Sequence, residues 1–390
     1  MTDTVGPAVT DTVHGTADAR FDKVRSMLAD NIDSGVEVGA SIAVDLHGEM
    51  VADLWGGHAD ADRTKPWTSE TIVNMWSCTK TVSALAALML VDRGELDVYE
   101  PVATYWPEFA ANGKEAIEVR HIMSHTSGVS GWDTPFSIED MYDWEKSTSQ
   151  LAAQAPWWEP GTASGYHSQN MGHLIGEVVR RVSGMTLKEF VRTEIAEPLG
   201  ADIQIGALPQ DDHRVAEVIP FKTRAFDLNS IEPGSVLYKT MFGPQGDPNV
   251  ANTLDWRRAD LGAVNGHGNA KSLARVLSVI SLGGTVGGVR LLGPDTIDLI
   301  FKEQANGVDL VLGVPLRWGI GYSLPKPETV PPIPDGERIA FWAGWGGSMI
   351  IAHPDRGLTI SYMMNKMADN SIVGSDIAHR YVAAIYEALA

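Results

Sequence analysis

Cysteine is nearly absent from this 390-residue sequence, which contains one, Cys78. A lone cysteine cannot form an internal disulfide, so the chain does not belong to the class of secreted proteins that disulfides stabilise. It also cannot supply the several thiolates of a cysteine-based metal cluster. We therefore expect no metal site and no cofactor.

Basic residues are also scarce, with 30 Lys and Arg against 50 Asp and Glu and a formal net charge of −20. A surface of this sign repels phosphate backbones and anionic lipid headgroups. Neither a nucleic acid nor a membrane surface is therefore expected as a partner. The composition gives no indication of the oligomeric state.

Long apolar runs and a targeting signal are missing as well. The longest unbroken apolar run, residues 84–91, is too short to span a bilayer. The first 20 residues lack the basic and apolar regions of a secretory signal, and we expect them to form a flexible N-terminal segment. These absences predict a cytoplasmic location.

Strand and helix patterns are concentrated at the two ends of the chain. Apolar residues at helical spacing predict helices over 21–33 and 372–389. Strand-like runs joined by short turns favour antiparallel pairing, and they cover 39–46, 50–55, 338–342, 348–353 and 358–364. We expect an α/β domain built from both termini (21–73 and 261–390) and a mostly helical domain between them (74–260), with the functional site at their interface.

The stretch around Ser77 is the most informative part of the sequence. From Val82 onward it is apolar on all sides, which predicts a buried helix that begins near Ser77. The first turn of a helix offers free N–H groups that favour a developing negative charge. Lys80 lies one turn beyond Ser77, and a buried lysine loses proton affinity and can act as a base. Ser77 and Lys80 are therefore candidates for nucleophile and base.

Two further elements could complete a site for acyl transfer. Tyr166 lies in a glycine-rich loop just before a helix predicted by the apolar stripe of residues 171–182. A tyrosine placed there could carry the leaving-group proton. Near the C-terminus, the run from Trp342 to Ser348 contains Gly344, and glycines in a strand indicate close approach by a ligand or by another backbone segment.

These elements occur in an order that resembles the serine β-lactamase-like superfamily. The chain is most similar to family VIII carboxylesterases, which resemble class C β-lactamases. The resemblance runs from about Phe21 to the C-terminus. It rests on Ser77-x-x-Lys80, Tyr166-x-Ser168, Trp342-x-Gly344, His125-Thr-Ser-Gly128, Glu159-Pro-Gly-Thr162 and Gly266-His-Gly-Asn-Ala270. It implies an α/β (α+β) fold of the β-lactamase/penicillin-binding-protein type, with an antiparallel sheet flanked by N- and C-terminal helices and a mostly helical domain.

The resemblance also implies roles for individual residues. Ser77 would form an acyl-enzyme, and Lys80 and Tyr166 would share the general base and acid roles as a coupled pair in which either could take the first proton. The backbone N–H groups of Ser77 and Trp345 would bind the oxyanion. Substrate contacts would come from Trp342, Gly344, Ser168 and His167.

Two departures from the family pattern bear on the substrate. The second element reads Tyr166-His167-Ser168 where β-lactamases usually have Tyr-x-Asn, and Trp342 replaces the lysine that attracts a substrate carboxylate. An indole cannot substitute for an ammonium group. The expected activity is therefore hydrolysis of short-chain, uncharged carboxylic esters. Tryptophans close to these elements fit an apolar pocket, although some could belong to the core: Trp76, Trp132, Trp157, Trp158, Trp342 and Trp345.

Other functions stay open at this point. On the same site, the chain could hydrolyse amides or oligoamides, transfer acyl groups to other acceptors, or act as a weak β-lactamase; on the same fold it could be a silent binding protein. A Ser-His-Asp hydrolase lacks its Gly-x-Ser-x-Gly signature here. His121 and His125 have zinc-ligand spacing, but Ile122 stands where a glutamate is needed, so we expect structural roles for both. The helix turns Cys78 about 100° away from Ser77, which argues against a thiol nucleophile.

Overall fold

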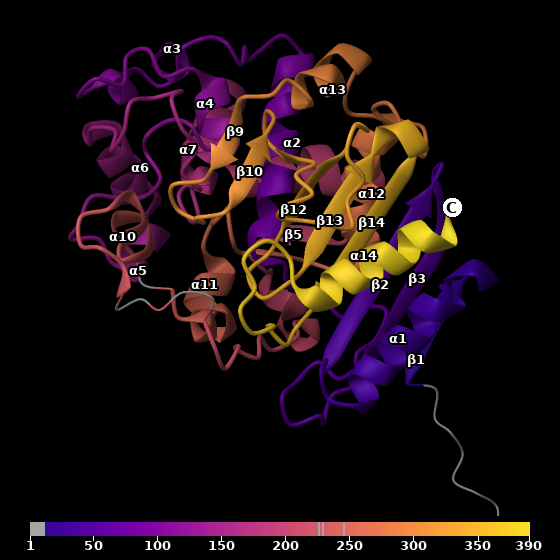
Figure 1. Ribbon diagram of the computed structural model, residues 1–390. Coiled ribbons are helices and arrows are strands. Elements are labelled where there is room, and N and C mark those ends of the chain that lie inside the picture. The colour runs from indigo at the N-terminus through magenta and orange to yellow at the C-terminus, as the bar shows by residue number, and fades with distance from the viewer. Residues whose placement is uncertain (1–11, 225–226, 228–229, 245) are drawn as a thin grey trace, which may run out of the picture.

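A nine-stranded sheet runs through the computed structural model, which describes residues 12–224, 227, 230–244 and 246–390 (Figure 1). Adjacent strands of this sheet pair in antiparallel fashion, as the strand patterns and turns predicted. In sheet order the strands are β1 (Val13–Ala17), β3 (Glu49–Gly57), β2 (Gly39–Leu46), β14 (Leu358–Met364), β13 (Met349–His353), β12 (Ala340–Ala343), β11 (Ser323–Leu324), β10 (Pro315–Trp318) and β9 (Ala305–Val308). Strands from both ends of the chain therefore lie side by side at the centre.

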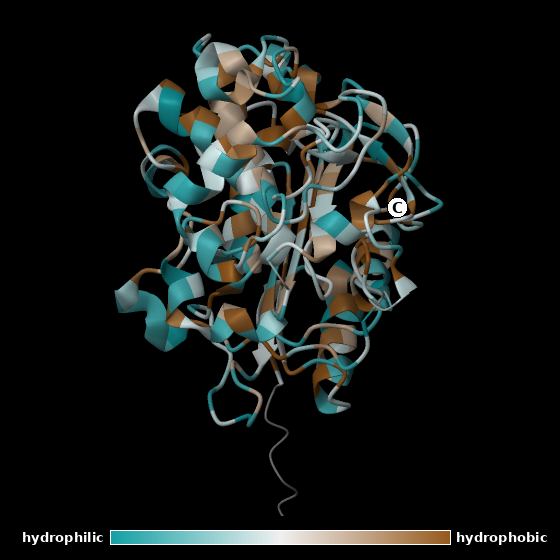
Figure 2. Cartoon of the chain, turned by 90° about the vertical axis from the view of Figure 1, so that its left-hand side faces the viewer, coloured by the Kyte–Doolittle hydropathy of each residue, from teal (hydrophilic) through white to brown (hydrophobic). Residues whose placement is uncertain are grey.

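Helices cover both faces of the sheet. On one face α1 (Asp22–Asp33) packs beside α14 (Asp376–Ala388), and the other face receives α12 (Ala270–Ser281). Side chains of β2 alternate accordingly, because Ile42 belongs to the apolar cluster of α1 and α14 and Ala43 belongs to that of α12. Figure 2 shows hydrophilic and hydrophobic residues side by side on the outer helices, as expected for amphipathic helices.

The segment between the sheet strands is mostly helical, as expected. Its helices are α2 (Thr79–Asp92), α3 (Val102–Tyr105), α4 (Val119–Met123), α5 (Ile138–Tyr142), α6 (Trp144–Ala153), α7 (Met171–Ser183), α8 (Leu187–Phe190), α9 (Glu197–Leu199), α10 (Val236–Met241) and α11 (Leu254–Arg258). Its shorter helical turns are η2 (Trp76–Cys78), η3 (Pro107–Ala110), η4 (Val191–Ala196), η5 (Pro209–Arg214) and η7 (Pro248–Asn252). The division of the chain into two domains stays a prediction.

The remaining elements are short. A small sheet joins β4 (Val73–Asn74), β6 (Gly266–Gly268) and β5 (Ile203–Ile205), and a hairpin joins β7 (Thr285–Val286) to β8 (Val289–Arg290). The others are α13 (Pro294–Ile300), η1 (Ala19–Phe21) and η8 (Pro354–Arg356). None of the described helices is long and apolar enough to cross a membrane.

The prediction of a flexible segment up to residue 20 is wrong for its last part. Val13–Ala17 forms β1 and pairs with β3, and η1 follows it; residues 1–11 lie outside the described part of the chain. β1 is an edge strand whose backbone hydrogen bonds hold it in place, and Val13 is its one buried side chain. A polar edge strand of this kind has no apolar pattern by which the sequence could predict it.

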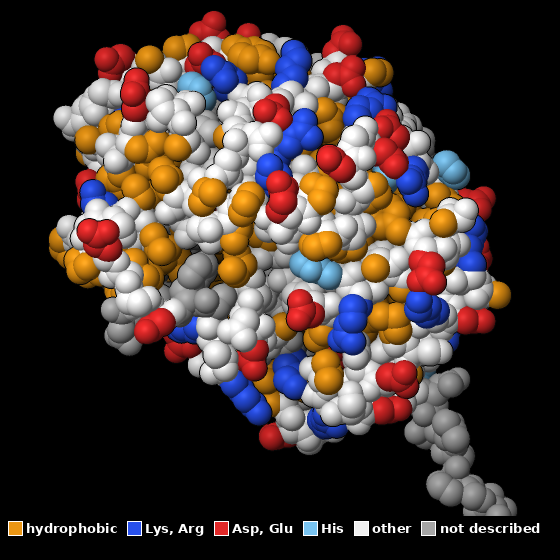
Figure 3. Space-filling view, in the orientation of Figure 1, with side chains coloured by type: hydrophobic (Ala, Val, Ile, Leu, Met, Phe, Trp, Pro, Cys, Tyr) orange, Lys and Arg blue, Asp and Glu red, His pale blue; other side chains and the backbone are white. Residues whose placement is uncertain are grey.

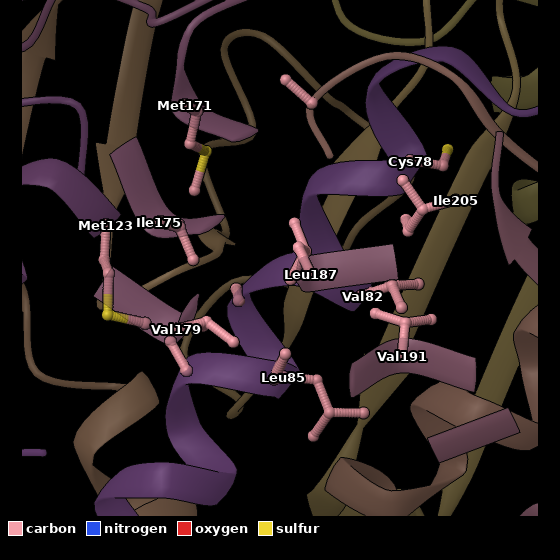
Figure 4. Packing of buried hydrophobic residues seen from close by; sticks show 14 of the residues in the cluster. Cys78, Val82, Leu85, Met123, Met171, Ile175, Val179, Leu187, Val191 and Ile205 are labelled. Atoms are coloured by element: carbon pink, nitrogen blue, oxygen red, sulfur yellow. The ribbon is translucent and has the colours of Figure 1, made fainter. Parts of the chain in front are cut away.

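Helix α2 lies in the core and positions the start of the functional site. Its residues from Thr79 to Leu90 are all buried, and Figure 4 shows it surrounded by side chains of neighbouring elements such as Met171, Ile175 and Val191. The sequence placed the helix start near Ser77. In the structure Ser77 lies in the middle of η2, and α2 begins two residues later.

The surface carries charges of both signs. On the face shown in Figure 3, acidic and basic side chains are interspersed, and hydrophobic side chains gather on the left, where α5, α6 and α10 lie in Figure 1. The net charge of −20 is therefore spread over a mixed surface on this face rather than collected in one patch.

Candidate active site

Ser77 is held between α2 and the small sheet. The backbone N–H of Met75 donates to Gly266 O (2.7 Å), and the N–H of Gly266 donates to Thr79 Oγ1 (2.8 Å). A Cβ on Gly266 would lie 2.6 Å from Thr79 Oγ1, so this close approach requires glycine. Trp76 has a positive φ of 50°, which is rare for a residue with a side chain. Such strain is found where a structure holds a functional residue in place.

Lys80 points at Ser77 and is almost completely buried, with 2% exposure. Its Nζ lies 3.0 Å from Ser77 Oγ, 2.7 Å from Ser168 O and 3.0 Å from Ala263 O. Burial holds the pKa of Lys80 well below its usual value. A neutral amine has two N–H groups and one lone pair, which matches two carbonyl acceptors and one hydroxyl. Lys80 is therefore arranged to accept the Ser77 proton.

Tyr166 forms the third corner of the site. Its Oη accepts a hydrogen bond from Trp342 Nε1 (2.8 Å), its side chain is also a hydrogen-bond partner of Ser77, and Lys80 Nζ lies 4.8 Å from its ring centroid. Burial raises the pKa of Tyr166, although its hydrogen bonds with Ser77 and Trp342 oppose this shift. The phenol therefore keeps its proton and is suited to donate it.

Gly344, directly after β12, allows the chain to approach Met75 and Trp76, the residues just before Ser77. A Cβ there would lie 2.1 Å from Ser348 Oγ and 2.6 Å from Met75 O. Gly344 N–H donates to Ser348 O (2.7 Å), which closes the turn between β12 and β13. The N–H of Gly344 is therefore already engaged in this hydrogen bond. Trp345 is the next residue along the pocket wall.

A cavity of about 220 Å³ opens in front of these residues. Its walls are mostly apolar, and Arg224 and Asp247 are their charged residues within the described part of the chain. Beside Ser77, Tyr166 and the β12 residues, the lining includes Trp76, Ile138, Phe221, Met241, Phe242, Val250, Trp256, Val311, Leu312, Trp345 and Ile372. The sequence alone pointed to few of these positions.

The structure brings most of the proposed site residues together. Ser77, Tyr166, Ser168, Trp342, Gly344 and Trp345 all line the cavity, and Lys80 lies directly behind Ser77. The proposed substrate contact by His167 is wrong. That side chain is fully buried away from the cavity, with Nε2 2.6 Å from Ser127 Oγ and Nδ1 2.7 Å from Gly165 O.

The His125-Thr-Ser-Gly128 stretch holds the loop that carries Tyr166. His125 O accepts from Gly165 N (2.9 Å), His125 Nδ1 accepts from His167 N (3.0 Å), and Gly128 O accepts from Trp157 N (2.7 Å). Burial keeps the pKa of His125 well below its usual value, so its ring is neutral and Nδ1 is free to accept. These contacts agree with the structural role expected for His125.

The tryptophans divide between the pocket and other sites. Trp76, Trp342 and Trp345 line the cavity, and Trp132 is buried beside Phe136. Trp158 Nε1 donates to Ala163 O (3.0 Å) in the Tyr166 loop, and Trp157 Nε1 donates to Asp133 Oδ1 (2.8 Å). Trp256 lines the cavity as well, with its ring centroid 5.7 Å from that of Trp76. No motif in the sequence pointed to Trp256.

Cys78 is unsuited to act as a nucleophile at this site. Burial raises the pKa of Cys78 to about 12, and its Sγ lies 3.6 Å from Ser348 Oγ, so it is a protonated packing residue. In the described part of the chain, no cluster of three or more His, Cys, Asp or Glu side chains could hold a metal ion.

Comparison with known proteins gives consistent matches over most of the chain. Residues 24–384 match the model of the beta-lactamase family. The esterase/beta-lactamase LipL of Mycobacterium tuberculosis (strain ATCC 25618 / H37Rv) is 31% identical over 375 residues, which cover 93% of this chain and 85% of that protein.

Solved structures match at similar length. A family VIII carboxylesterase superposes with a TM-score of 0.89 and 39% identity, covering 96% of this chain and 99% of the other. A penicillin-binding protein homologue from Caulobacter crescentus gives a TM-score of 0.88 and 36% identity with the same coverage.

Proposed function

Because the chain belongs to the beta-lactamase family, as a β-lactamase-like serine hydrolase, we propose that it cleaves short-chain carboxylic esters through an acyl-enzyme on Ser77. The observation that carries this proposal is the position of Lys80. Its Nζ lies 3.0 Å from Ser77 Oγ, and its two other contacts are backbone carbonyls, which leaves the lone pair of a neutral amine for the serine hydroxyl. A neutral, buried amine in this position activates the hydroxyl without any further base.

Acylation then proceeds with named proton transfers. Ser77 Oγ attacks the ester carbonyl while its proton passes to Lys80 Nζ, and the backbone N–H groups of Ser77 and Trp345 bind the oxyanion. When the C–O bond to the alcohol breaks, Tyr166 donates its phenolic proton to the leaving oxygen. Lys80 returns a proton to Tyr166, so the first product is a neutral alcohol and the acyl group stays on Ser77.

Water completes the reaction by the reverse path. A water molecule attacks the acyl carbonyl and passes a proton to the Lys80–Tyr166 pair. The bond between the acyl carbon and Ser77 Oγ breaks, and that proton returns to the serine. The carboxylic acid leaves, and all three side chains regain their starting protonation.

The pocket favours an uncharged ester. The formal charges of Arg224 and Asp247 cancel, and the other lining residues are neutral. Trp342 occupies the position where the family pattern has a lysine, and its Nε1 is bonded to Tyr166 (2.8 Å). Position 342 therefore offers no ammonium group to a substrate carboxylate. We therefore place β-lactam hydrolysis well below ester hydrolysis.

A substrate panel tests this proposal. We expect kcat/KM for p-nitrophenyl acetate or butyrate to exceed that for the matching p-nitroanilide and for nitrocefin by at least about 10²-fold. A fluorophosphonate probe should add one adduct, and peptide mapping should place it on Ser77. A higher kcat/KM for the anilide or for nitrocefin would contradict the ester assignment, and absence of an adduct would leave the silent binding protein as the better explanation.

Replacing Cys78 with alanine is expected to keep kcat/KM for the same esters within about threefold of the native value. The thiol is buried, and its raised pKa of about 12 keeps it protonated at neutral pH. The small cavity left by the sulfur should cost about 1 kcal/mol of unfolding free energy. Ester kinetics together with thermal unfolding check both expectations, and complete loss of turnover in a folded variant would reopen a thiol mechanism.

A further inference from the structure

Asp309 is a buried carboxylate that the proposed reaction does not use. It lies directly after β9, has 1% exposure, and its side-chain partners are neutral hydrogen-bond donors. Oδ2 accepts from Ser164 Oγ (2.9 Å). Oδ1 accepts from three backbone N–H groups, each at 3.0 Å, those of Tyr166, Val311 and Leu312. Burying a carboxylate without a cation is costly, so its retention calls for a specific role.

We propose that Asp309 is a positioning residue that holds Tyr166 and the pocket wall at Val311 and Leu312 in one fixed arrangement. The inference rests on the acid role proposed above for Tyr166. One carboxylate oxygen bonds the backbone of the acid and the backbone of two residues that line the cavity. Neither part can shift without loss of hydrogen bonds to the other.

Contacts on both sides of Tyr166 leave little freedom to its backbone. The N–H groups of Gly165 and His167 are held by His125, and the N–H of Tyr166 between them is held by Asp309. The turn that carries Asp309 is itself closed, since Asp309 N donates to Val314 O (3.0 Å) and Gly313 N donates to Asp309 O (2.9 Å). Asp309 therefore supplies the one side-chain acceptor for the amide of the catalytic tyrosine.

The position of Tyr166 matters because proton donation requires close geometry. A displacement of about 1 Å in a catalytic group can cost on the order of 10²-fold in rate. A substrate that fills the cavity touches the wall formed by Val311 and Leu312, and this wall shares its anchor with the acid. The fit of the substrate and the placement of the proton donor are therefore coupled through one side chain.

Two substitutions separate geometry from charge. Asp309→Asn removes the charge, but its amide oxygen can still accept the three N–H bonds, and we expect kcat for ethyl butyrate, whose leaving group needs the acid, to stay within about fivefold of the native value. Asp309→Glu keeps the charge and moves the acceptor by about one methylene. We expect it to lower kcat on the order of 10²-fold. If the glutamate variant does not fold, Asp309→Ala takes its place with the same expectation.

Ser164→Ala is the matched control. It removes the hydroxyl that donates to Oδ2 and leaves the three bonds to Oδ1 in place. We expect Ser164→Ala to lose about as much thermal stability as Asp309→Glu does, while its kcat stays within about threefold of the native value. Equal losses of kcat in the control and in Asp309→Glu would mean that Asp309 is a structural residue only.

Fluorophosphonate labelling gives a second readout on the same proteins. Fluoride leaves without help from an acid, so labelling of Ser77 should stay within a few-fold of native in every variant while ester turnover falls in Asp309→Glu. Equal kcat losses in Asp309→Asn and Asp309→Glu, or a labelling rate that falls as far as turnover, would overturn the positioning role. Absence of ester turnover in the native protein would instead refute the proposed function.

Discussion

Replacing Ser77 with alanine is expected to abolish turnover of p-nitrophenyl esters. Loss of the nucleophile in a serine hydrolase lowers kcat by on the order of 10⁶-fold, because no other group can form the acyl-enzyme. Lys80 loses one partner but keeps its bonds to Ser168 O and Ala263 O. The unfolding free energy should therefore change by no more than about 1 kcal/mol. Steady-state kinetics and thermal unfolding measure these two consequences, and intact mass after fluorophosphonate treatment should show no adduct.

Ser83→Ala is the matched control for this variant. Ser83 is a buried serine on α2, and its hydroxyl donates to Gly262 O. Its loss removes a buried hydrogen bond and should cost about 1 kcal/mol of stability, while activity and labelling stay within a few-fold of native. Turnover or a Ser77-independent adduct in Ser77→Ala would show that another residue carries the reaction.

The elements that the sequence predicted share a strong apolar signal. Strands β2 and β14 begin and end at the predicted residues, because each is a continuous buried run bounded by turn residues. Helix α7 follows from its apolar stripe, and its Gly184 cap has a positive φ of 78°. The catalytic candidates were identified because Ser77 and Lys80 lie one helical turn apart in an otherwise apolar run.

The wrong assignment of His167 has a physical reason. It stands between Tyr166 and Ser168, and neighbours in sequence are easily assigned to one site. In a loop, however, neighbouring side chains can point in different directions. Tyr166 and Ser168 face the cavity, and His167 faces Ser127 in the core.

The pocket walls could not be predicted because they come from segments without a periodic pattern. Phe221 lies in a loop, Phe242 directly follows α10, and Trp256 lies in the five-residue helix α11; the fold of the chain brings all three to the cavity. Asp309 is one aspartate among many in the sequence. Its importance follows from burial and from its bond to the amide of Tyr166, neither of which leaves a mark in the local sequence.

Lys80→Met and Tyr166→Phe are expected to differ in how their effects depend on the leaving group. We expect Lys80→Met to lower kcat/KM by about 10³- to 10⁴-fold for p-nitrophenyl and ethyl esters alike, because Ser77 needs its base with either substrate. Tyr166→Phe should cost roughly tenfold with p-nitrophenyl butyrate, whose phenolate leaves unaided. With ethyl butyrate it should cost about 10³-fold or more, because an ethoxide must be protonated as it leaves.

The pH dependence of the native protein provides the matching control. The pKa of Lys80 lies well below its usual value because of burial, so kcat/KM should rise with pH as the ammonium loses its proton. The raised pKa of Tyr166 keeps the phenol protonated over the same range, and the lowered pKa values of His125 and His167 keep both rings neutral. This rise should be retained in Tyr166→Phe and absent from Lys80→Met. If the leaving-group dependence instead belonged to Lys80→Met, and the pH dependence were lost in Tyr166→Phe, the two roles would be exchanged.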